Sequence, residues 1–311
     1  MSLAANQVVG NYECLGIIGK PRAGVTYKVR NLATGELEAL RALPGAGSRD
    51  PESVERLLRE IRVQARLSHP NIIALHDAFE LDGHLVMTTD FAEGPTLAEL
   101  CSRGPLPPRD AIRVMIQVLN GLEEAHALAI VHRGISAEHV IVTSDGTVKL
   151  GGFDLAKPAS DATLTQVGAT IGNPRYISPE QVAGRALDAR SDLYSAGVLL
   201  YQALTGKLPF EAESDFDALA AQVASPPRPP SAVNPELPPE LDGIVLQALM
   251  KNPDERFQNA GEFRAALEAV ETATQTAPPA RAPKRPLRMW LVFGCFAVLI
   301  GLAVVSWVAL H

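Results

Sequence analysis

The residues best suited to chemistry lie close together in this chain, between positions 132 and 156. The segment reads HRGISAEHVIVTSDGTVKLGGFDLA and contains the imidazoles of His132 and His139 and the carboxylates of Glu138 and Asp154. Magnesium prefers hard carboxylate oxygens, whereas an imidazole suits zinc. We expect His139 to be an ordinary loop histidine, and we expect the chain to hold no metal ion.

Strands early in the chain and helices later must position this segment. Residues 26–29, 37–42 and 84–89 are short, rich in apolar side chains and bounded by Gly, Pro or Asp, as strands are. Residues 111–128 place apolar side chains at steps of three and four, which indicates an amphipathic helix. Residues 191–204 are more uniformly apolar and predict a helix inside a lobe. This order predicts an α+β body.

The order of motifs resembles that of protein kinases, most nearly the eukaryotic-like Ser/Thr kinases of bacteria. That family writes its catalytic loop as H-R-D-L-K-P-x-N and its metal-binding turn as D-F-G. Here the loop begins with His132 and Arg133, and the turn reads GFD. The other matching segments follow in the family's order, from the glycine-rich loop to the late P-x-x-R-F element: residues 19–24, 38–41, 173–180, 189–198 and 252–257.

The resemblance covers about residues 12–270 and implies a two-lobed kinase fold. It implies a β-rich small lobe over residues 12–93 and a helical large lobe over residues 94–270, after an N-terminal tail of residues 1–11. The family's reactive positions are replaced in this chain, so the resemblance implies no catalytic residues. The degenerate positions are Arg41, Gly134, Ser136, His139 and Gly152.

The replaced groups are the ones that phosphoryl transfer uses. Relative to the family, Gly134 replaces the base, Ser136 a neighbouring lysine, and His139 and Gly152 the metal ligands. Arg41 keeps the charge of the family's lysine but is not interchangeable with it. Asp154 lies two residues past Gly152, which moves a carboxylate roughly 6–7 Å along an extended chain. We therefore expect neither magnesium binding nor phosphoryl transfer.

The retained family residues are those with structural roles. We expect a bidentate pair between Arg41 and Glu60, and a buried ion pair between Glu180 and Arg256. Arg133 matches the residue that receives an activation-loop phosphate, which Thr163, Thr165 or Thr170 could carry, although pairing with local backbone is the simpler role. The full structural set is Glu60, His132, Arg133, Phe153, Glu180, Asp192 and Arg256.

A nucleotide slot is partly retained. Small or apolar residues stand where the family holds adenine, and hinge backbone follows Thr89. ATP binding without a metal therefore stays open, although no cofactor is required. The candidate nucleotide-binding residues are Gly19, Gly24, Ala39, Arg41, Thr89, Asp90, Ala92 and Ile141.

The apolar run of residues 289–310 predicts a membrane anchor. It contains no charged side chain, and as a helix it would span roughly 33 Å, enough for a bilayer core of about 30 Å. Basic residues crowd positions 281–288 ahead of it, so the positive-inside rule places the N-terminal domain in the cytoplasm. The Pro- and Ala-rich stretch between, residues 271–288, predicts an extended basic linker.

Composition excludes other classes. The net charge of −7 and the absence of a basic stripe argue against nucleic-acid binding. The three cysteines have no metal or disulfide spacing and suit a reducing compartment.

Together these features predict a membrane-anchored cytoplasmic pseudokinase that regulates signalling by binding a protein, either an active kinase or its substrate. We expect docking through the large lobe or the Pro-rich residues 225–239. Two alternatives remain: an atypical Ser/Thr kinase that uses Arg41 and Asp154, and a nucleotide sensor that binds ATP without catalysis.

Overall fold

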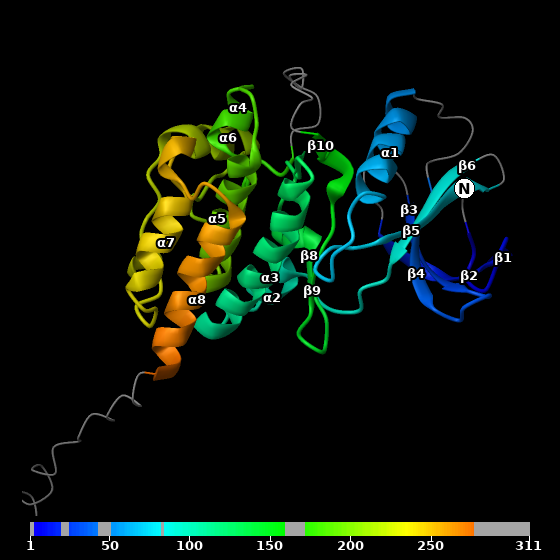
Figure 1. Ribbon diagram of the computed structural model, residues 1–311, viewed down its shortest axis with the longest axis horizontal. Helices are drawn as coiled ribbons and strands as arrows, with labels where there is room; N and C mark the ends of the chain where they lie inside the picture. Colours follow the sequence, from blue (N-terminus) through cyan, green and yellow to red (C-terminus); the bar gives the residue numbers. More distant parts are fainter. Residues whose placement is uncertain (1–2, 20–24, 43–50, 82–83, 159–171, 277–311) are drawn as a thin grey trace, which may run out of the picture. The chain divides into compact units, whose positions relative to one another are not determined.

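The structure, a computed structural model, has a β-rich lobe followed along the chain by a helical lobe (Figure 1). Residues up to Thr272 form one compact unit that contains both lobes. The described residues are 3–19, 25–42, 51–81, 84–158 and 172–276.

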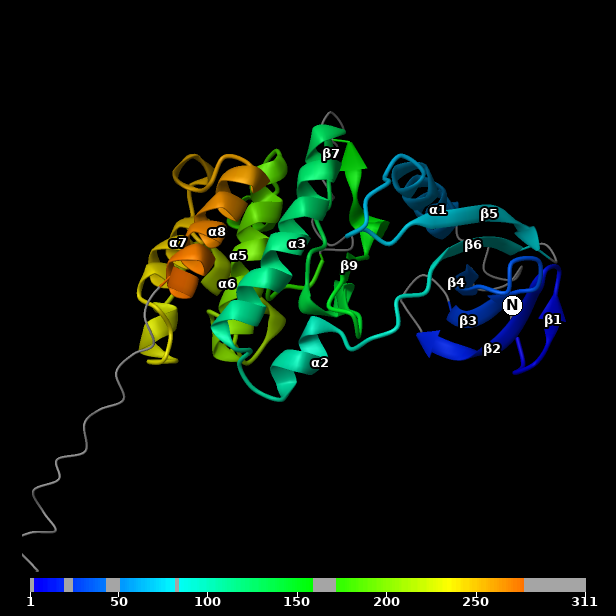
Figure 2. The same cartoon turned by 60° about the horizontal axis from the view of Figure 1, so that its bottom comes forward.

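The small lobe is built on one six-stranded antiparallel sheet in the order β1-β2-β3-β4-β6-β5. Its strands are β1 Val8–Val9, β2 Tyr12–Gly19, β3 Val25–Asn31, β4 Leu37–Ala42, β5 Leu75–Leu81 and β6 His84–Asp90. Helix α1, Pro51–Gln64, lies beside β5 (Figure 2). Leu57 of the helix and Met87 of β6 are the buried centre of this contact.

The large lobe is mainly helical. Its α-helices are α2 Leu97–Ser102, α3 Pro108–Ala127, α4 Pro179–Val182, α5 Ala189–Thr205, α6 Asp215–Ala224, α7 Glu240–Ala248 and α8 Ala260–Thr276. Short 3₁₀ turns are η1 Ala137–His139, η2 Phe153–Leu155, η3 Pro230–Ala232 and η4 Pro253–Glu255. Two small antiparallel pairs complete the lobe: β7 Ile130–Val131 with β10 Lys157–Pro158, and β8 Val140–Val142 with β9 Val148–Leu150.

Helix α5 is the centre of the large lobe. Nearly all its side chains are buried, and α3 and α7 pack against it, as the uniformly apolar residues 191–204 predict. Asp188 caps its N-terminus through the Arg190 N–H, and Gly206 ends it with a φ of +69°, a left-handed conformation that glycine adopts without strain. The sequence placed helix α3 at residues 111–128; it starts three residues earlier because Pro108 has the fixed φ suited to a first helical position.

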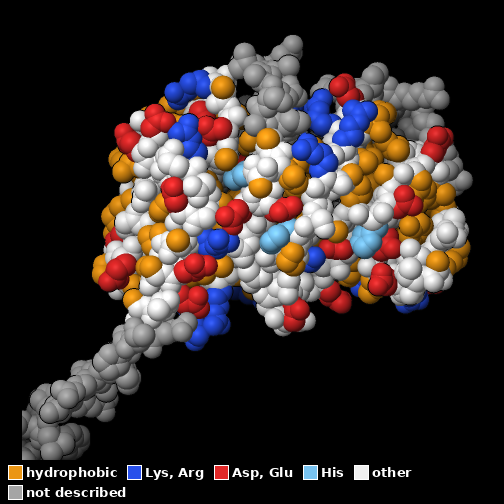
Figure 3. All heavy atoms as spheres, in the orientation of Figure 1, with side chains coloured by type: hydrophobic (Ala, Val, Ile, Leu, Met, Phe, Trp, Pro, Cys, Tyr) orange, Lys and Arg blue, Asp and Glu red, His pale blue; other side chains and the backbone are white. Residues whose placement is uncertain are grey.

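The surface carries both signs of charge. On the face shown in Figure 3, acidic and basic side chains are interspersed over the large lobe, while Lys and Arg side chains gather over α1.

Some sequence predictions fall outside the described residues: Gly24, the three activation-loop threonines, most of the linker and the apolar residues 289–310. Among the helices that are described, none has the length and apolar character needed to cross a membrane.

Candidate functional site

Asp192 of α5 fixes the backbone of the loop that starts at His132. Its carboxylate accepts hydrogen bonds from the backbone N–H groups of His132 and Arg133, at 2.8 and 2.9 Å, and from the His126 ring at 2.8 Å. Burial acts to raise the pKa of Asp192, but the His126 hydrogen bond and the nearby imidazoles outweigh it and lower the pKa. The loop is therefore attached to the most buried helix of the lobe.

His132 connects this loop to the turn at residues 151–154. Its Nε2–H donates to the Gly151 carbonyl oxygen at 2.9 Å, and its Nδ1 accepts from the Gly134 N–H at 3.2 Å. Its ring lies 4.4 Å from that of Phe153, centroid to centroid. The side chain is fully buried, and burial lowers its pKa, so the imidazole is neutral.

The His139 imidazole fills the space in front of Gly152. A Cβ atom added at residue 152 would lie 2.5 Å from both Cγ and Nδ1 of His139, closer than real Cβ contacts occur. Nδ1 of this ring lies 2.8 Å from the Gly134 carbonyl oxygen and 3.3 Å from the Ser136 hydroxyl oxygen. Because a carbonyl only accepts, Nδ1 must carry the proton and donate.

Four of the five degenerate positions thus contact one another. His139 bonds to the residues at 134 and 136, and its ring occupies the volume that any side chain at 152 would need. Gly152 has a φ of +79°, so a side chain there would also be strained. The sequence predicted an ordinary loop histidine and gave no sign of this contact.

Arg41 of β4 and Glu60 of α1 form an ion pair, but the predicted bidentate geometry is wrong. Only Nη2 of Arg41 meets Glu60, through Oε2, and its Nε has no hydrogen-bond partner among the described residues. The pair links the sheet to the helix within the small lobe. Burial lowers the pKa of Arg41, and the charge of Asp154 partly offsets that effect.

The candidate nucleotide residues that are described lie along the hinge and its neighbours. Ala39 of β4 pairs with Thr89 of β6, and Ile141 of β8 pairs with Lys149 of β9. Within the described part of the chain, the backbone N–H and carbonyl of Ala92 make no hydrogen bond. Gly19 pairs with Thr26 at the end of β2.

The Asp90 carboxylate is already engaged at the hinge. It accepts from Lys149 Nζ at 2.8 Å, from the Ala74 N–H at 3.2 Å and pairs with the His76 ring at 2.9 Å. Burial acts to raise its pKa, but these hydrogen bonds outweigh burial and lower it. Asp90 thus joins β5, β6 and β9, which favours a structural role for its side chain. Its backbone N–H donates to the Ala74 carbonyl oxygen at 3.0 Å, so only its backbone carbonyl is left for a ligand.

The remaining family residues lie where they support the large lobe. Glu180 receives two hydrogen bonds from Arg256, at 2.7 and 2.8 Å, and a third from the Ser191 hydroxyl at 2.7 Å. The Arg133 carbonyl accepts from the Gln181 amide at 2.9 Å. Within the described ranges, no group of three or more His, Cys, Asp or Glu side chains could hold a metal ion.

The sequence profile of the protein kinase domain matches residues 12–269. The chain belongs to the protein kinase family. The fold agrees with that of the kinase domain of PknI from Mycobacterium tuberculosis, with a TM-score of 0.66 and 28% identity, over 86% of this chain and 99% of that one.

Curated relatives in the family are bacterial Ser/Thr kinases. A probable serine/threonine-protein kinase of Streptomyces coelicolor is 39% identical over 84% of this chain and 40% of its own length. Serine/threonine-protein kinase PknB of Mycobacterium tuberculosis is 35% identical over 88% of this chain and 44% of its own length. The chain thus spans less than half the length of these relatives.

Proposed function

We propose that this chain is a pseudokinase, a kinase fold that binds partner proteins without transferring phosphate. The observation that carries the proposal is the His139 ring, which takes the space of any side chain at position 152, where the family has a metal-binding carboxylate. Gly134 leaves the family's base position without a side chain. Phosphoryl transfer depends on positioning and charge neutralisation, and this loop supplies neither the cation site nor the base.

The proposal is tested by the metal dependence of ATP binding. The 311-residue chain, purified in detergent, is melted with ATP in the presence and absence of Mg²⁺. A ligand at 100 times its Kd adds about 2.7 kcal/mol to the free energy of unfolding, which a melting curve resolves. We expect Mg²⁺ to add nothing to any effect of ATP. A shift that requires both ATP and Mg²⁺ would contradict the proposal.

An atypical kinase that uses Arg41 and Asp154 is the second candidate. The influence of the Asp154 charge on the Arg41 pKa favours it, because the two charged groups interact electrostatically. In that case Asp154→Ala abolishes a Mg²⁺-dependent ATP effect.

A nucleotide sensor is the third candidate, and the free backbone groups of Ala92 favour it. It requires ATP to stabilise the chain equally with and without metal. Ala39→Trp, which fills the slot opposite Thr89, should remove that stabilisation.

The setting of this activity is also a proposal. Residues 289–310 would anchor the chain as a single pass, with the kinase domain in the cytoplasm and a signalling protein as partner, either an active kinase or its substrate. Carbonate extraction and protease protection of cells expressing the chain test the anchor and its orientation. Release into the soluble fraction would contradict it.

A further inference from the structure

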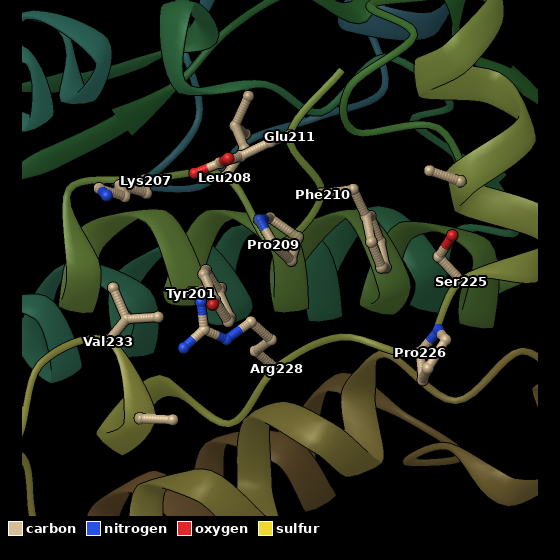
Figure 4. Close-up of a pocket in the computed structure, with 12 residues that line it drawn as sticks. Tyr201, Lys207, Leu208, Pro209, Phe210, Glu211, Ser225, Pro226, Arg228 and Val233 are labelled. Carbon is tan, nitrogen blue, oxygen red and sulfur yellow. The ribbon is translucent and has the colours of Figure 1, made fainter.

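A cavity of about 500 Å³ lies in the large lobe, away from the site between the lobes (Figure 4). It is bounded by the end of α5, the loop before α6, the end of α6 and the Pro-rich residues that follow. Its volume is in the range of ligand pockets, about 300–1,000 Å³. The buried rings of Tyr201 and Phe210 form the floor, and exposed Lys207, Glu211 and Arg228 stand at the rim.

The Tyr201 hydroxyl is a donor without a partner at the bottom of this cavity. The residue is 2% exposed, yet its hydroxyl makes no hydrogen bond within the described part of the chain. Figure 4 shows it facing the guanidinium of Arg228. Burial raises the pKa of Tyr201, so the phenol keeps its proton and can donate. Because this hydroxyl opens on the cavity and has no protein partner among the described residues, it is available to donate to a ligand that enters.

The charged side chains that line the cavity favour an anion, although Asp242, which is not part of the lining, also acts on Tyr201. Lys207 and Arg228 line the cavity, and neither forms an ion pair with any described residue. Glu211 is the one carboxylate among the lining residues, so the lining carries a net positive charge. A guanidinium and a phenol O–H directed at one point suit a carboxylate or a phosphate, whose oxygens accept several charge-assisted hydrogen bonds.

The walls suit a side chain of a partner protein. Pro226 lines the cavity and Pro227 and Pro229 flank Arg228, so fixed φ angles hold this segment in place before any ligand binds. A rigid site loses less conformational entropy on binding. The apolar floor of Tyr201, Phe210 and Pro209 would contact the carbon atoms that carry the oxyanion.

We propose that this cavity is a docking pocket for an oxyanion-bearing side chain of a partner protein, bound by Tyr201, Arg228 and Lys207. The inference rests on the proposed function, since a pseudokinase acts by binding, and it gives the partner's chemistry. The oxyanion is either a carboxylate or a phosphate group. The sequence predicted docking through the large lobe or residues 225–239, a range that contains Arg228. It singled out none of the three side chains, because a tyrosine within an apolar helix is typical of a core and the two cations are typical of an exposed loop.

Ligand-observed NMR titrations of the 311-residue chain test the pocket with four small probes. Benzoate and phenyl phosphate carry the two oxyanions on a ring, and benzyl alcohol and benzylammonium are the neutral and cationic controls. We expect saturable binding of an oxyanion probe and none of benzylammonium. Tighter binding of benzoate would identify the partner's group as an acidic side chain, and tighter binding of phenyl phosphate would identify it as a phosphorylated one.

Three variants and a control make the assignment specific. Tyr201→Phe should weaken the oxyanion probe roughly tenfold with an unchanged melting temperature, because the hydroxyl has no protein partner to lose. Arg228→Ala should weaken binding of the oxyanion probe at least as much. Glu211→Gln should tighten that binding, because it removes a negative charge that repels the probe. Arg62→Ala, which removes an exposed arginine in the small lobe, should have no effect.

Equal affinity in the wild type, Tyr201→Phe and Arg228→Ala would overturn the proposal, as would binding of benzylammonium as tight as that of benzoate and phenyl phosphate. Absence of any probe binding up to solubility would also overturn it. Phosphate transfer by the chain would contradict the pseudokinase proposal without altering the probe affinities, so the two failures are distinguishable.

Discussion

At the residue scale, the substitutions in the catalytic loop are mutually dependent. The His139 ring is compatible with residue 152 only because that residue is glycine, and its Nδ1–H is held by the Gly134 carbonyl. A side chain at residue 152 therefore clashes with the His139 ring before it could restore any chemistry. In this loop the His139 ring contacts Gly134 and Ser136.

Gly152→Ala should destabilise the chain through this clash. Gly35 is a matched control, since its φ of +78° equals that of Gly152 within a degree but nothing lies within 4 Å of an added Cβ. Gly35→Ala should cost about 1–2 kcal/mol of unfolding free energy from backbone strain. Gly152→Ala should cost a further ~1–3 kcal/mol from overpacking. Urea unfolding of both variants measures the difference.

The same pair in a His139→Ala background completes a double-mutant cycle. There the two glycine substitutions should cost the same, because the ring is gone. A Gly152→Ala cost that matches Gly35→Ala in the wild type, or that stays larger without the ring, would show that His139 does not fill this space.

His132 should give the fold a pH dependence below neutrality. Burial lowers its pKa in the folded chain, so below the unfolded value of about 6.5 the unfolded state binds more protons and stability falls as the pH falls. The slope is at most about 1.4 kcal/mol per pH unit. Chemical unfolding between pH 7.5 and 5 should show this slope reduced in His132→Phe. Equal slopes in both proteins would contradict the assignment of the slope to His132. The groups whose charges act on His132, namely Asp192, His139 and Asp154, are present in both proteins, so the difference in slope reports on residue 132.

At the scale of elements, charged contacts differ according to burial. The pair Glu180–Arg256 joins α4 to the residue that follows η4, and both side chains are at most 5% exposed. The pair Arg190–Asp254 joins α5 to the same turn, but the Asp254 side chain is 78% exposed. If the Glu180–Arg256 pair loses one partner, the other is left as a buried, unpaired charge. If the Arg190–Asp254 pair loses one partner, water solvates the charge that remains.

Glu180→Gln should therefore lower the free energy of unfolding by about 3–5 kcal/mol, since Arg256 stays buried without a counter-charge. Asp254→Asn is the matched substitution at the exposed pair and should cost less than about 1 kcal/mol. Urea unfolding in high and low salt gives both values, because urea is uncharged and leaves the ionic strength free to vary. Similar losses for the two variants would show that burial does not govern these contacts.

The sequence was most informative about elements and least about how side chains meet. Ordered motifs predicted the kinase fold, and apolar periodicity located α3 and α5 within a few residues, because both depend on short-range pattern. The prediction of a bidentate Arg41–Glu60 pair was wrong. Whether one or two guanidinium nitrogens reach Glu60 depends on where α1 lies against the sheet, which the sequence does not specify. The roles of His139 and Tyr201 depend on rotamers and on neighbours distant in sequence, which no local pattern encodes.

At the scale of the whole molecule, the contacts that stabilise the fold are present, while the His139 ring fills the space in front of Gly152. Asp192, Glu180 and Arg256 hold the large lobe, and Arg41 and Glu60 join the sheet to α1. These contacts hold the surface of the domain in a stable form. On that surface, the cavity at Tyr201 is our proposed binding site for an oxyanion. We propose that binding, rather than phosphate transfer, is the activity of this chain.

The most direct test of this account is transfer of radiolabelled γ-phosphate from ATP, with Mg²⁺ or Mn²⁺, to the chain itself and to a general protein substrate. Asp154→Ala and Arg41→Ala are assayed beside the wild type, so that label common to all three is assigned to a contaminating kinase. The account predicts no incorporation above that common level. Incorporation by the wild type that Asp154→Ala abolishes would contradict it and establish the chain as an atypical kinase.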